Sequence, residues 1–160
     1  TQTNNRRGFD LALNDVYQKA KIENIEYGLI VLDIDDFKRF NDHYGHPEGD
    51  KCLISVSNTL QKTVERPIDM VARIGGEEFI ILLPNTDLEG AEYIAQKVID
   101  AIRDLKYPHT ESSVSQFVTL SIGVSCAWPS NQDEPELIIQ AADKGLYKAK
   151  ASGRNCAKAY

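Results

Sequence analysis

Arg73-Ile74-Gly75-Gly76-Glu77-Glu78-Phe79-Ile80-Ile81-Leu82-Leu83-Pro84 reads as a central β-hairpin, and the rest of the chain is arranged around it. Gly75 and Gly76 separate two strand-like runs. Paired glycines are typical of a two-residue hairpin turn because both positions take positive φ freely. Glu77 and Glu78 follow at once, at the tip of the ribbon. Such a pair is either ordinary charged surface or, since glycine lets a ligand approach the backbone, part of a metal–phosphate site.

Hydrophobic periodicity predicts helices and strands along the whole chain. Expected helices cover about 5–22, 37–44, 51–64, 87–105 and 136–152, and expected strands cover 27–32, 70–74, 77–83, 117–127 and 155–160. Gly45 is the expected C-cap of the second helix, Asp50 the expected N-cap of the third, and Asp87 or Thr86 that of the fourth. Gly123 lies in a strand where a neighbouring element is expected to pack against the backbone.

This order of elements predicts an α+β domain with a mostly antiparallel sheet and a ferredoxin-like βαββαβ core flanked by helices. Such a core places the end of the first strand beside the hairpin tip. We therefore expect Asp33, Glu77 and Glu78 to lie within reach of one cation. Residues 1–160 are expected to form one domain, and the abrupt opening Thr1-Gln2-Thr3 suggests a piece of a longer protein.

Composition excludes several classes of function. A net charge of −6 argues against binding along a nucleic-acid backbone. No apolar run approaches the roughly 18 residues of a membrane span, so no direct membrane contact is expected. Cys52, Cys126 and Cys156 are odd in number and widely spaced, which indicates free thiols in a reducing cytoplasm, although the parent protein could be anchored to a membrane.

The acidic run Asp33-Ile34-Asp35-Asp36 follows the first strand and has two interpretations. Acids at a strand end often cap the next helix, and they also bind hard metal ions. A calcium-binding EF-hand loop does not fit, because Phe37 occupies the fifth position and no glycine occupies the sixth. The run alone does not decide between the two.

A series of motifs in order resembles the GGDEF family of diguanylate cyclases, in its GGEEF form. The motifs are Asn5-Arg6-Arg7, Asp33-Ile34-Asp35-Asp36-Phe37-Lys38, Asn41-Asp42, Gly45-His46, Gly49-Asp50, Arg73 with Gly75-Gly76-Glu77-Glu78-Phe79, Ser121-Ile122-Gly123-Val124, Ala142-Asp143, Leu146-Tyr147, Ala149-Lys150 and Gly153-Arg154-Asn155. The resemblance implies a fold like that of nucleotidyl cyclases and polymerase palms. Gly145 departs from the usual alanine, and we expect a helix cost of about 1 kcal/mol at most.

The resemblance also implies the catalytic and metal-binding residues. Asp33, the backbone carbonyl of Ile34 and Glu77 correspond to ligands of Mg²⁺, with Mn²⁺ as a possible substitute. Glu78 corresponds to the second acid, which completes the metal shell or helps to deprotonate the attacking hydroxyl. Lys150 and Arg154 correspond to cations that hold phosphate. Their alternative role is favourable charge at a helix C-terminus.

GTP-binding residues follow from the same resemblance. Those implied for substrate binding are Phe37, Lys38, Asn41, His46, Asp50, Arg73, Gly75 and Gly76. Asn41 and Asp50 correspond to the positions that read the guanine edge, and a carboxylate accepts from donors that adenine lacks. Asp50 has an equally good alternative as a helix N-cap. Arg73 has one as a surface ion pair.

The implied reaction converts two GTP into cyclic di-GMP and two pyrophosphates, so two domains must face each other in a homodimer. An upstream sensory or dimerisation domain is expected. Arg66-Pro67-Ile68-Asp69 matches the RxxD of the family's inhibitory product site, with Lys97 as a third member. The alternative is a local Arg66–Asp69 ion pair. Two rival functions stay open: a module that binds GTP or cyclic di-GMP without turnover, and a cyclase or polymerase relative that acts on another nucleotide.

Overall fold

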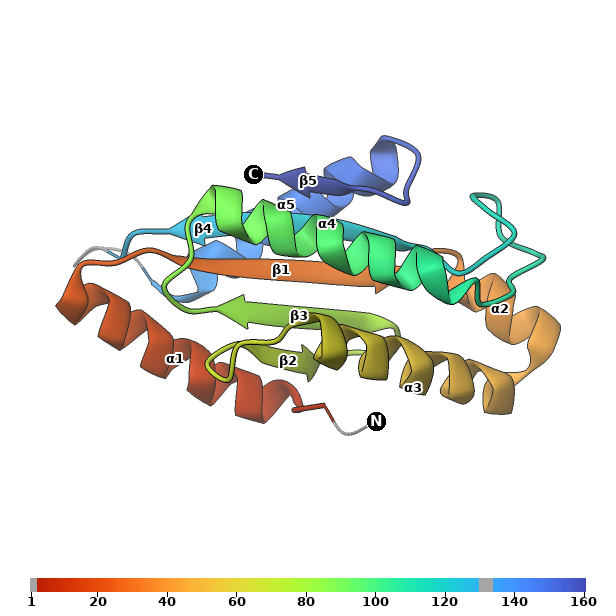
Figure 1. Ribbon diagram of the computed structural model, residues 1–160, viewed down its shortest axis with the longest axis horizontal. Coiled ribbons are helices and arrows are strands. Elements are labelled where there is room, and N and C mark those ends of the chain that lie inside the picture. Colours follow the sequence, from red (N-terminus) through yellow and green to blue (C-terminus); the bar gives the residue numbers. More distant parts are fainter. Residues whose placement is uncertain (1–2, 130–133) are drawn as a thin grey trace.

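The computed structural model describes residues 3–129 and 134–160, in which helices flank one β-sheet (Figure 1). The elements in chain order are α1 (Arg6–Glu23), β1 (Tyr27–Ile34), α2 (Phe37–Tyr44), α3 (His46–Thr63), β2 (Met70–Arg73), β3 (Glu78–Leu83), α4 (Leu88–Leu105), β4 (Leu120–Ala127), α5 (Glu136–Ala151) and β5 (Ala157–Ala159).

The five-stranded sheet confirms the expected topology. Its strand order is β2-β3-β1-β4-β5, and the first four strands follow the ferredoxin-like arrangement. All pairings are antiparallel except that of β4 with the short edge strand β5. In the pairing of β1 with β3, Asp33 lies opposite Glu78. The topology therefore brings the end of the first strand to the hairpin, as the sequence predicted.

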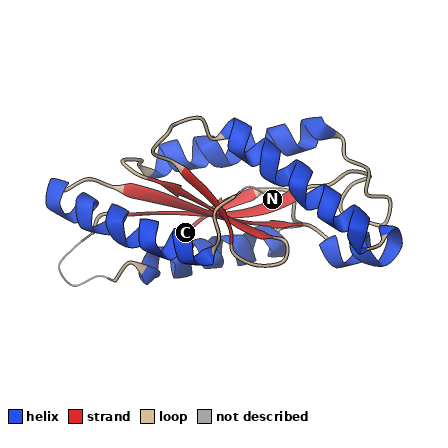
Figure 2. Cartoon of the chain, turned by 90° about the horizontal axis from the view of Figure 1, so that it is seen from below, coloured by secondary structure: helices blue, strands red, loops and turns tan. Residues whose placement is uncertain are grey.

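Helices cover both faces of the sheet, which Figure 2 shows from its edge. Helices α2, α3 and α4 pack on the face formed by residues such as Ile30, Leu32 and Ile81. Helices α1 and α5 pack on the opposite face, formed by residues such as Leu29 and Ile80. Because strand residues alternate between faces, Asp33 and Glu78 lie on the α1/α5 face. Strand β1 is buried from both sides, as its continuous apolar run predicted.

Helix α5 approaches the sheet unusually closely because two glycines meet. A Cβ on Gly123 of β4 would lie 1.9 Å from the Ala142 carbonyl oxygen, and one on Gly145 of α5 would lie 2.4 Å from the Lys158 carbonyl oxygen. The expectation that an element packs against Gly123 is confirmed. Gly145 lowers helix propensity slightly, but it is also required by the packing, because the side chain of an alanine there would collide with β5. This close packing sets the distance between the strand ends and the C-terminal turn of α5.

Two local predictions were wrong. Helix α3 begins at His46 with Gly45 as its N-cap, so Asp50 lies inside the helix and does not cap it. Pro47 lies in the first turn of α3, where proline is well tolerated. Gly45 does end α2, and Asp87 caps α4 by accepting from the Gly90 N–H.

The second wrong prediction concerns the hairpin turn. Gly75 and Gly76 do not have positive φ, and the loop runs from Ile74 to Glu77. The Ile74 N–H closes this loop by donating to the Glu78 carbonyl oxygen at 3.0 Å. Strand β4 also begins later than expected, at Leu120. Helix α1 and edge strand β5 lie within about two residues of their expected limits.

All three cysteines are free, in agreement with the absence of a disulfide pattern. Within residues 3–129 and 134–160, no helix combines the length and apolar character needed to cross a membrane.

Candidate active site

The candidate active site begins with an acidic pair at the junction of β1 and β3. Asp33 and Glu78 are direct cross-strand partners, a relation that places their Cβ atoms about 4.5–5.5 Å apart. Asp33 Oδ2 accepts from Lys150 Nζ of α5 at 2.6 Å. Asp33 Oδ1 is buried and has no hydrogen-bond partner among the described residues. One carboxylate oxygen is therefore neutralised by a lysine, while the other is desolvated without compensation.

Electrostatics at Glu78 indicates that this corner of the fold carries excess negative charge. Burial raises the pKa of Glu78, and the nearby charges of Asp143 and Asp33 raise it further. Lys150 opposes this effect, whereas Glu77 adds to it. Like charges close together disfavour ionisation unless a cation neutralises them. The site therefore gains most from a bound positive charge placed between these side chains.

Glu77 lies in the loop before β3 and is partly exposed. Because Glu77 precedes the strand, the alternation of strand side chains does not set its orientation relative to Glu78. The Glu77 carbonyl oxygen accepts from the Ile34 N–H at 3.4 Å, which ties the loop to the end of β1. Glu77 thus stays next to Asp33 and Ile34 in space.

The loop that holds Glu77 is braced by Arg73. Arg73 Nη2 donates to the Gly76 carbonyl oxygen at 2.8 Å, and Nε donates to the same oxygen at 3.0 Å. Both glycines are exposed, and a Cβ on Gly76 would meet nothing within 4 Å. Neither backbone strain nor crowding therefore explains the two glycines. Close approach of a ligand to the backbone would explain them.

The turn after α5 carries Arg154 beside the acidic run. Arg154 is exposed, and its charge acts on Asp36 in the turn between β1 and α2. Burial raises the pKa of Asp36, but two hydrogen bonds from Ser113, together with Arg154 and Arg39, outweigh it and lower that pKa overall. Lys150 and Arg154 thus both lie near the acidic run that begins at Asp33.

Residues expected to read guanine gather where α2 meets α3. Asn41 of α2 packs against Gly49 of α3 so closely that a Cβ on Gly49 would lie 1.8 Å from Asn41 Oδ1. This oxygen is buried without a hydrogen-bond partner in the described part of the chain. Asp50 and His46 are exposed on the same end of α3. The structure therefore offers an unsatisfied amide beside a free carboxylate.

The remaining expected substrate residues differ in exposure. Phe37 is buried in the core and stacks on Phe40, with ring centroids 5.8 Å apart. Lys38 follows it and is exposed. Phe37 therefore supports the floor of this region, and Lys38 is free to reach a ligand.

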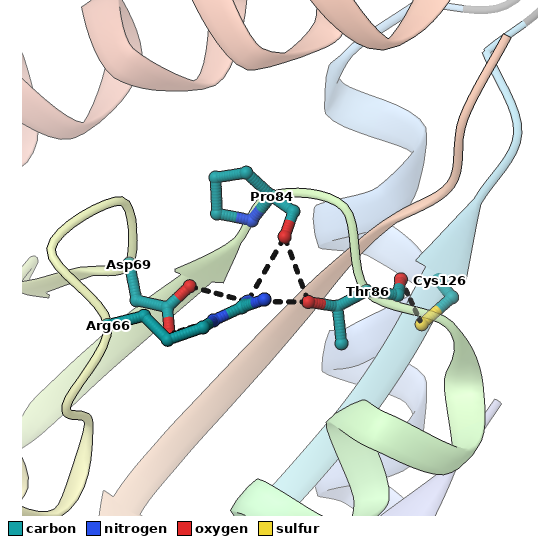
Figure 3. A network of polar contacts seen from close by, with 5 residues as sticks. All are labelled: Arg66, Asp69, Pro84, Thr86 and Cys126. Atoms are coloured by element: carbon teal, nitrogen blue, oxygen red, sulfur yellow. Dashed lines mark hydrogen bonds and ion pairs between the residues drawn. The ribbon is translucent and has the colours of Figure 1, made fainter.

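Arg66 and Asp69 lie away from this corner, in a network shown in Figure 3. Arg66 binds Asp69 through two hydrogen bonds, at 2.9 and 2.7 Å, and also donates to the Pro84 carbonyl at 3.1 Å and to Thr86 Oγ1 at 2.7 Å. The Asp69 side chain is 1% exposed and that of Arg66 is 44% exposed. The local ion pair considered from the sequence is thus present, and it fastens the β3–α4 loop.

A pocket of about 540 Å³ adjoins this network. Arg66 and Lys97 supply its positive charges, while Lys97 Nζ also lies 3.6 Å from Glu65 Oε1. Four acidic side chains line the same pocket, namely Glu26, Glu65, Asp69 and Asp87. Trp128 and Tyr93 contribute exposed aromatic rings. Both cations are therefore already paired with carboxylates.

Sequence reasoning missed two residues of the main site. Asp35 is 3% exposed and accepts from Thr119 Oγ1 at 2.7 Å, Ser121 Oγ at 2.5 Å and the Asn155 N–H at 3.0 Å. The sequence shows that Asp35 belongs to an acidic run, but it does not reveal these buried contacts. Asp143 of α5 contributes charge to Glu78, and only the fold reveals that proximity.

The donor set fits a hard divalent cation such as Mg²⁺. Carboxylate oxygens are the ligands that this ion prefers, and it keeps part of its shell for water and phosphate. Asp33 Oδ1 supplies a buried oxygen that has no partner among the described residues, and Glu78 is the cross-strand neighbour of Asp33. Across the described ranges, no three acidic, histidine or cysteine side chains already converge on one ion. The described side chains alone therefore leave part of the shell of such an ion open.

Comparison with known proteins gives a consistent family. The family described as "Diguanylate cyclase, GGDEF domain" matches residues 1–156. An uncharacterised protein, YhcK of Bacillus subtilis, is 41% identical over 94% of this chain and 42% of its own length. The probable diguanylate cyclase DgcT of Escherichia coli is 39% identical over 86% of this chain and 30% of its own length. The chain therefore spans less than half of these two relatives.

Among solved structures, a similar one contains the coiled coil and GGDEF domain of DgcB from Caulobacter crescentus in complex with c-di-GMP. It superposes with a TM-score of 0.89 at 27% identity, covering 100% of this chain and 83% of that one.

Proposed function

The chain belongs to the GGDEF family of diguanylate cyclase domains, and from this we propose that it condenses two molecules of GTP into cyclic di-GMP. Each 3′-hydroxyl attacks the α-phosphorus of the other GTP, and each bond from that phosphorus to pyrophosphate breaks. The observation that carries the proposal is the acidic pair of Asp33 and Glu78, with an unsatisfied Asp33 oxygen and a lysine alongside.

We propose that Asp33, Glu77, Glu78 and the Ile34 carbonyl hold Mg²⁺, with Mn²⁺ as an alternative. When bound, the ion lowers the pKa of the hydroxyl and neutralises phosphate charge. The raised pKa of Glu78 supports this arrangement, because a site with excess negative charge gains from a cation. Glu78 is also our candidate for the group that accepts the proton of the attacking hydroxyl.

Lys150 and Arg154 hold the phosphates in this proposal. Lys150 Nζ already lies against Asp33, and the charge of Arg154 acts on Asp36, so both cations lie near the acidic run where we propose that a triphosphate meets the metal. Gly75 and Gly76 leave the backbone of the braced loop open to a ligand. The glycines that the free protein does not require are thereby explained.

Guanine recognition is assigned to Asn41 and Asp50, with His46 and Lys38 nearby. The amide oxygen of Asn41 has no partner in the described part of the chain, and the Asp50 carboxylate is exposed beside it. A carboxylate accepts from guanine N1–H and the 2-amino group, which adenine lacks. This favours GTP over the rival reading in which another nucleotide is the substrate.

The chain carries a single set of these residues, whereas the reaction needs two opposed nucleotides. We propose that two copies meet about a two-fold axis with their GTP sites facing. Dimerisation by another part of the parent protein would supply this arrangement, as the coiled coil beside the GGDEF domain of DgcB suggests. The domain is then active only as a homodimer.

The product is proposed to inhibit through the pocket of Arg66 and Lys97. The complex of DgcB with c-di-GMP supports binding of the product in a related domain. In this protein Asp69 is buried against Arg66, so the exposed edge of Arg66 and the Lys97 ammonium would meet the ligand. The product would have to displace Glu65 from Lys97. Product titration with the GTP site blocked should show binding that Lys97→Met weakens, and unchanged binding would remove Lys97 from the site.

Turnover by an artificially dimerised form tests the main proposal. With GTP and Mg²⁺, the wild-type domain should yield cyclic di-GMP, whereas Asp33→Asn and Glu77→Gln should abolish the product with the fold intact. Asp104→Asn, a matched change at an exposed position of α4, should leave turnover unchanged. Retained turnover in the Asp33 and Glu77 variants would contradict the metal assignment.

A further inference from the structure

The turn that carries Arg154 has an unusual backbone. Gly153, Arg154 and Asn155 have φ angles of 105°, 66° and 51°, so three consecutive residues lie in the left-handed region. Residues other than glycine rarely adopt this conformation, because the Cβ crowds the following carbonyl. Such a turn persists only when contacts from outside it hold it in place.

Asn155 is the point at which those contacts converge. Its N–H donates to Oδ2 of the buried Asp35 at 3.0 Å. From α4, Arg103 Nε donates to Asn155 Oδ1 at 3.0 Å and Arg103 Nη2 donates to the Asn155 carbonyl oxygen at 2.9 Å. The backbone N–H, the carbonyl and the side chain of one residue are thus all fixed.

Asp35 is itself rigidly placed, because Thr119 and Ser121 of the β4 region donate to its two oxygens. Arg103 is different, since its side chain is 45% exposed and it lies outside the metal and nucleotide sites. Its planar fork matches the two oxygens of Asn155, a geometry that a lysine ammonium does not reproduce.

We propose that Arg103 and Asp35 are positioning residues that hold Arg154 against the triphosphate by fixing Asn155. The inference rests on the proposed function, in which Arg154 binds phosphate. Arg154 is exposed and directly precedes the clamped residue, so release of Asn155 would let the guanidinium leave its position near Asp36. Arg103 acts on GTP from a helix that contributes no residue to the proposed active site.

The clean test uses Arg103, because its exposure leaves the core undisturbed. Arg103→Met should weaken binding of guanosine 5′-(α,β-methylene)triphosphate with Mg²⁺, measured by isothermal titration, about 5- to 20-fold. Arg103→Lys should recover only part of this loss. Lys62→Met, which removes the same charge from an exposed position on α3, should bind like wild type. Thermal melting checks that each variant is folded.

A double-mutant cycle separates positioning from general structural support. In an Arg154→Met background, Arg103→Met should change affinity by less than about twofold, because no guanidinium remains to be positioned. An equal loss with and without Arg154, or no loss at all, would overturn the inference.

Product formation by the artificially dimerised domain is measured alongside, so that each of the two proposals can fail separately. If the wild-type domain binds the analogue but forms no cyclic di-GMP, the proposed function is refuted. The double-mutant cycle then still tests the role of Arg103. If the wild-type domain forms cyclic di-GMP but Arg103→Met binds the analogue as tightly as wild type, only the positioning role of Arg103 is refuted. Failure of the wild type to bind the analogue would overturn both.

Discussion

Gly49→Ala separates the stability of the fold from recognition of the base. The added Cβ would lie 1.8 Å from Asn41 Oδ1 and 3.0 Å from its Cγ, so the Asn41 side chain must rotate away. Alanine at the same time favours the helix by about 1 kcal/mol over glycine. Because the colliding group is the end of a flexible side chain, we expect the melting temperature to change by less than about 4 °C.

Binding should respond much more strongly than stability. Removing one partner from a buried polar contact costs about 1–3 kcal/mol, which corresponds to a roughly 5- to 150-fold loss of affinity for GTP. ATP, which lacks the guanine edge, should lose less. Titration with non-hydrolysable analogues of both nucleotides, together with thermal melting, measures the two effects separately.

Gly8→Ala in α1 is the matched control, since its Cβ would lie 3.4 Å from Asn5 Oδ1, an ordinary contact. It should leave nucleotide binding unchanged. Unaltered GTP affinity in Gly49→Ala would refute the assignment of Asn41 to guanine. A large fall in melting temperature would refute the idea that side-chain rotation relieves the collision.

Three further variants test the acidic corner, helix α3 and the Arg66 network. Burial and the nearby acids raise the pKa of Glu78, so its ionised form destabilises the metal-free fold as pH rises through that pKa. Without metal, Glu78→Gln should therefore have a higher melting temperature than wild type at about pH 8. Near pH 3, below the ordinary glutamate pKa of about 4.3, the two melting temperatures should be equal. Equal melting temperatures at both pH values would contradict this. Asp50→Ala should be as stable as wild type, because Asp50 does not cap α3. Its preference for GTP over ATP should fall about tenfold. A fall of about 1 kcal/mol in the free energy of unfolding would instead indicate that Asp50 caps the helix. Arg66→Met should lower the unfolding free energy by about 1–3 kcal/mol because it leaves Asp69 buried and unpaired, and adding Asp69→Leu should recover much of this loss; denaturant unfolding with no change would show that the pair is dispensable.

The adjacency of Asp33 and Glu78 was predictable because it depends on topology alone. A ferredoxin-like order of elements places the first strand beside the hairpin whatever the detailed contacts. The buried apolar run before Asp33 and the hairpin after Arg73 were enough to identify both strands. The proximity of Asp33 and Glu78 could therefore be predicted from the sequence without any knowledge of side-chain geometry.

Local signals failed where tertiary contacts outweighed them. The sequence predicted that the third helix starts after Asp50, but Gly49 already lies within α3, and Asn41 occupies the space that a side chain on Gly49 would need. Gly75 and Gly76 suggested a tight turn with positive φ, yet neither adopts it. At Gly49 the missing side chain makes room for Asn41, and at Gly75 and Gly76 the close approach of a ligand, which the sequence offered as an alternative, explains the glycines better than the turn does.

The contacts of Asp35 and Arg103 with Asn155 could not be predicted from the sequence. They join Asp35, Arg103 and the turn after α5, which come from three distant parts of the chain. No spacing or periodicity connects them. The same holds for the contribution of Asp143 to the pKa of Glu78, which depends on the close packing of α5 over Gly123.

Identification of the reaction product by mass tests the central proposal most directly. The artificially dimerised wild-type domain is incubated with GTP and Mg²⁺, with ATP in place of GTP as the comparison. We predict cyclic di-GMP and two equivalents of pyrophosphate from GTP, no cyclic product from ATP, and no product when the metal is removed by a chelator. A linear dinucleotide, equal use of ATP, or GTP bound without turnover would contradict the assignment of this domain as a diguanylate cyclase.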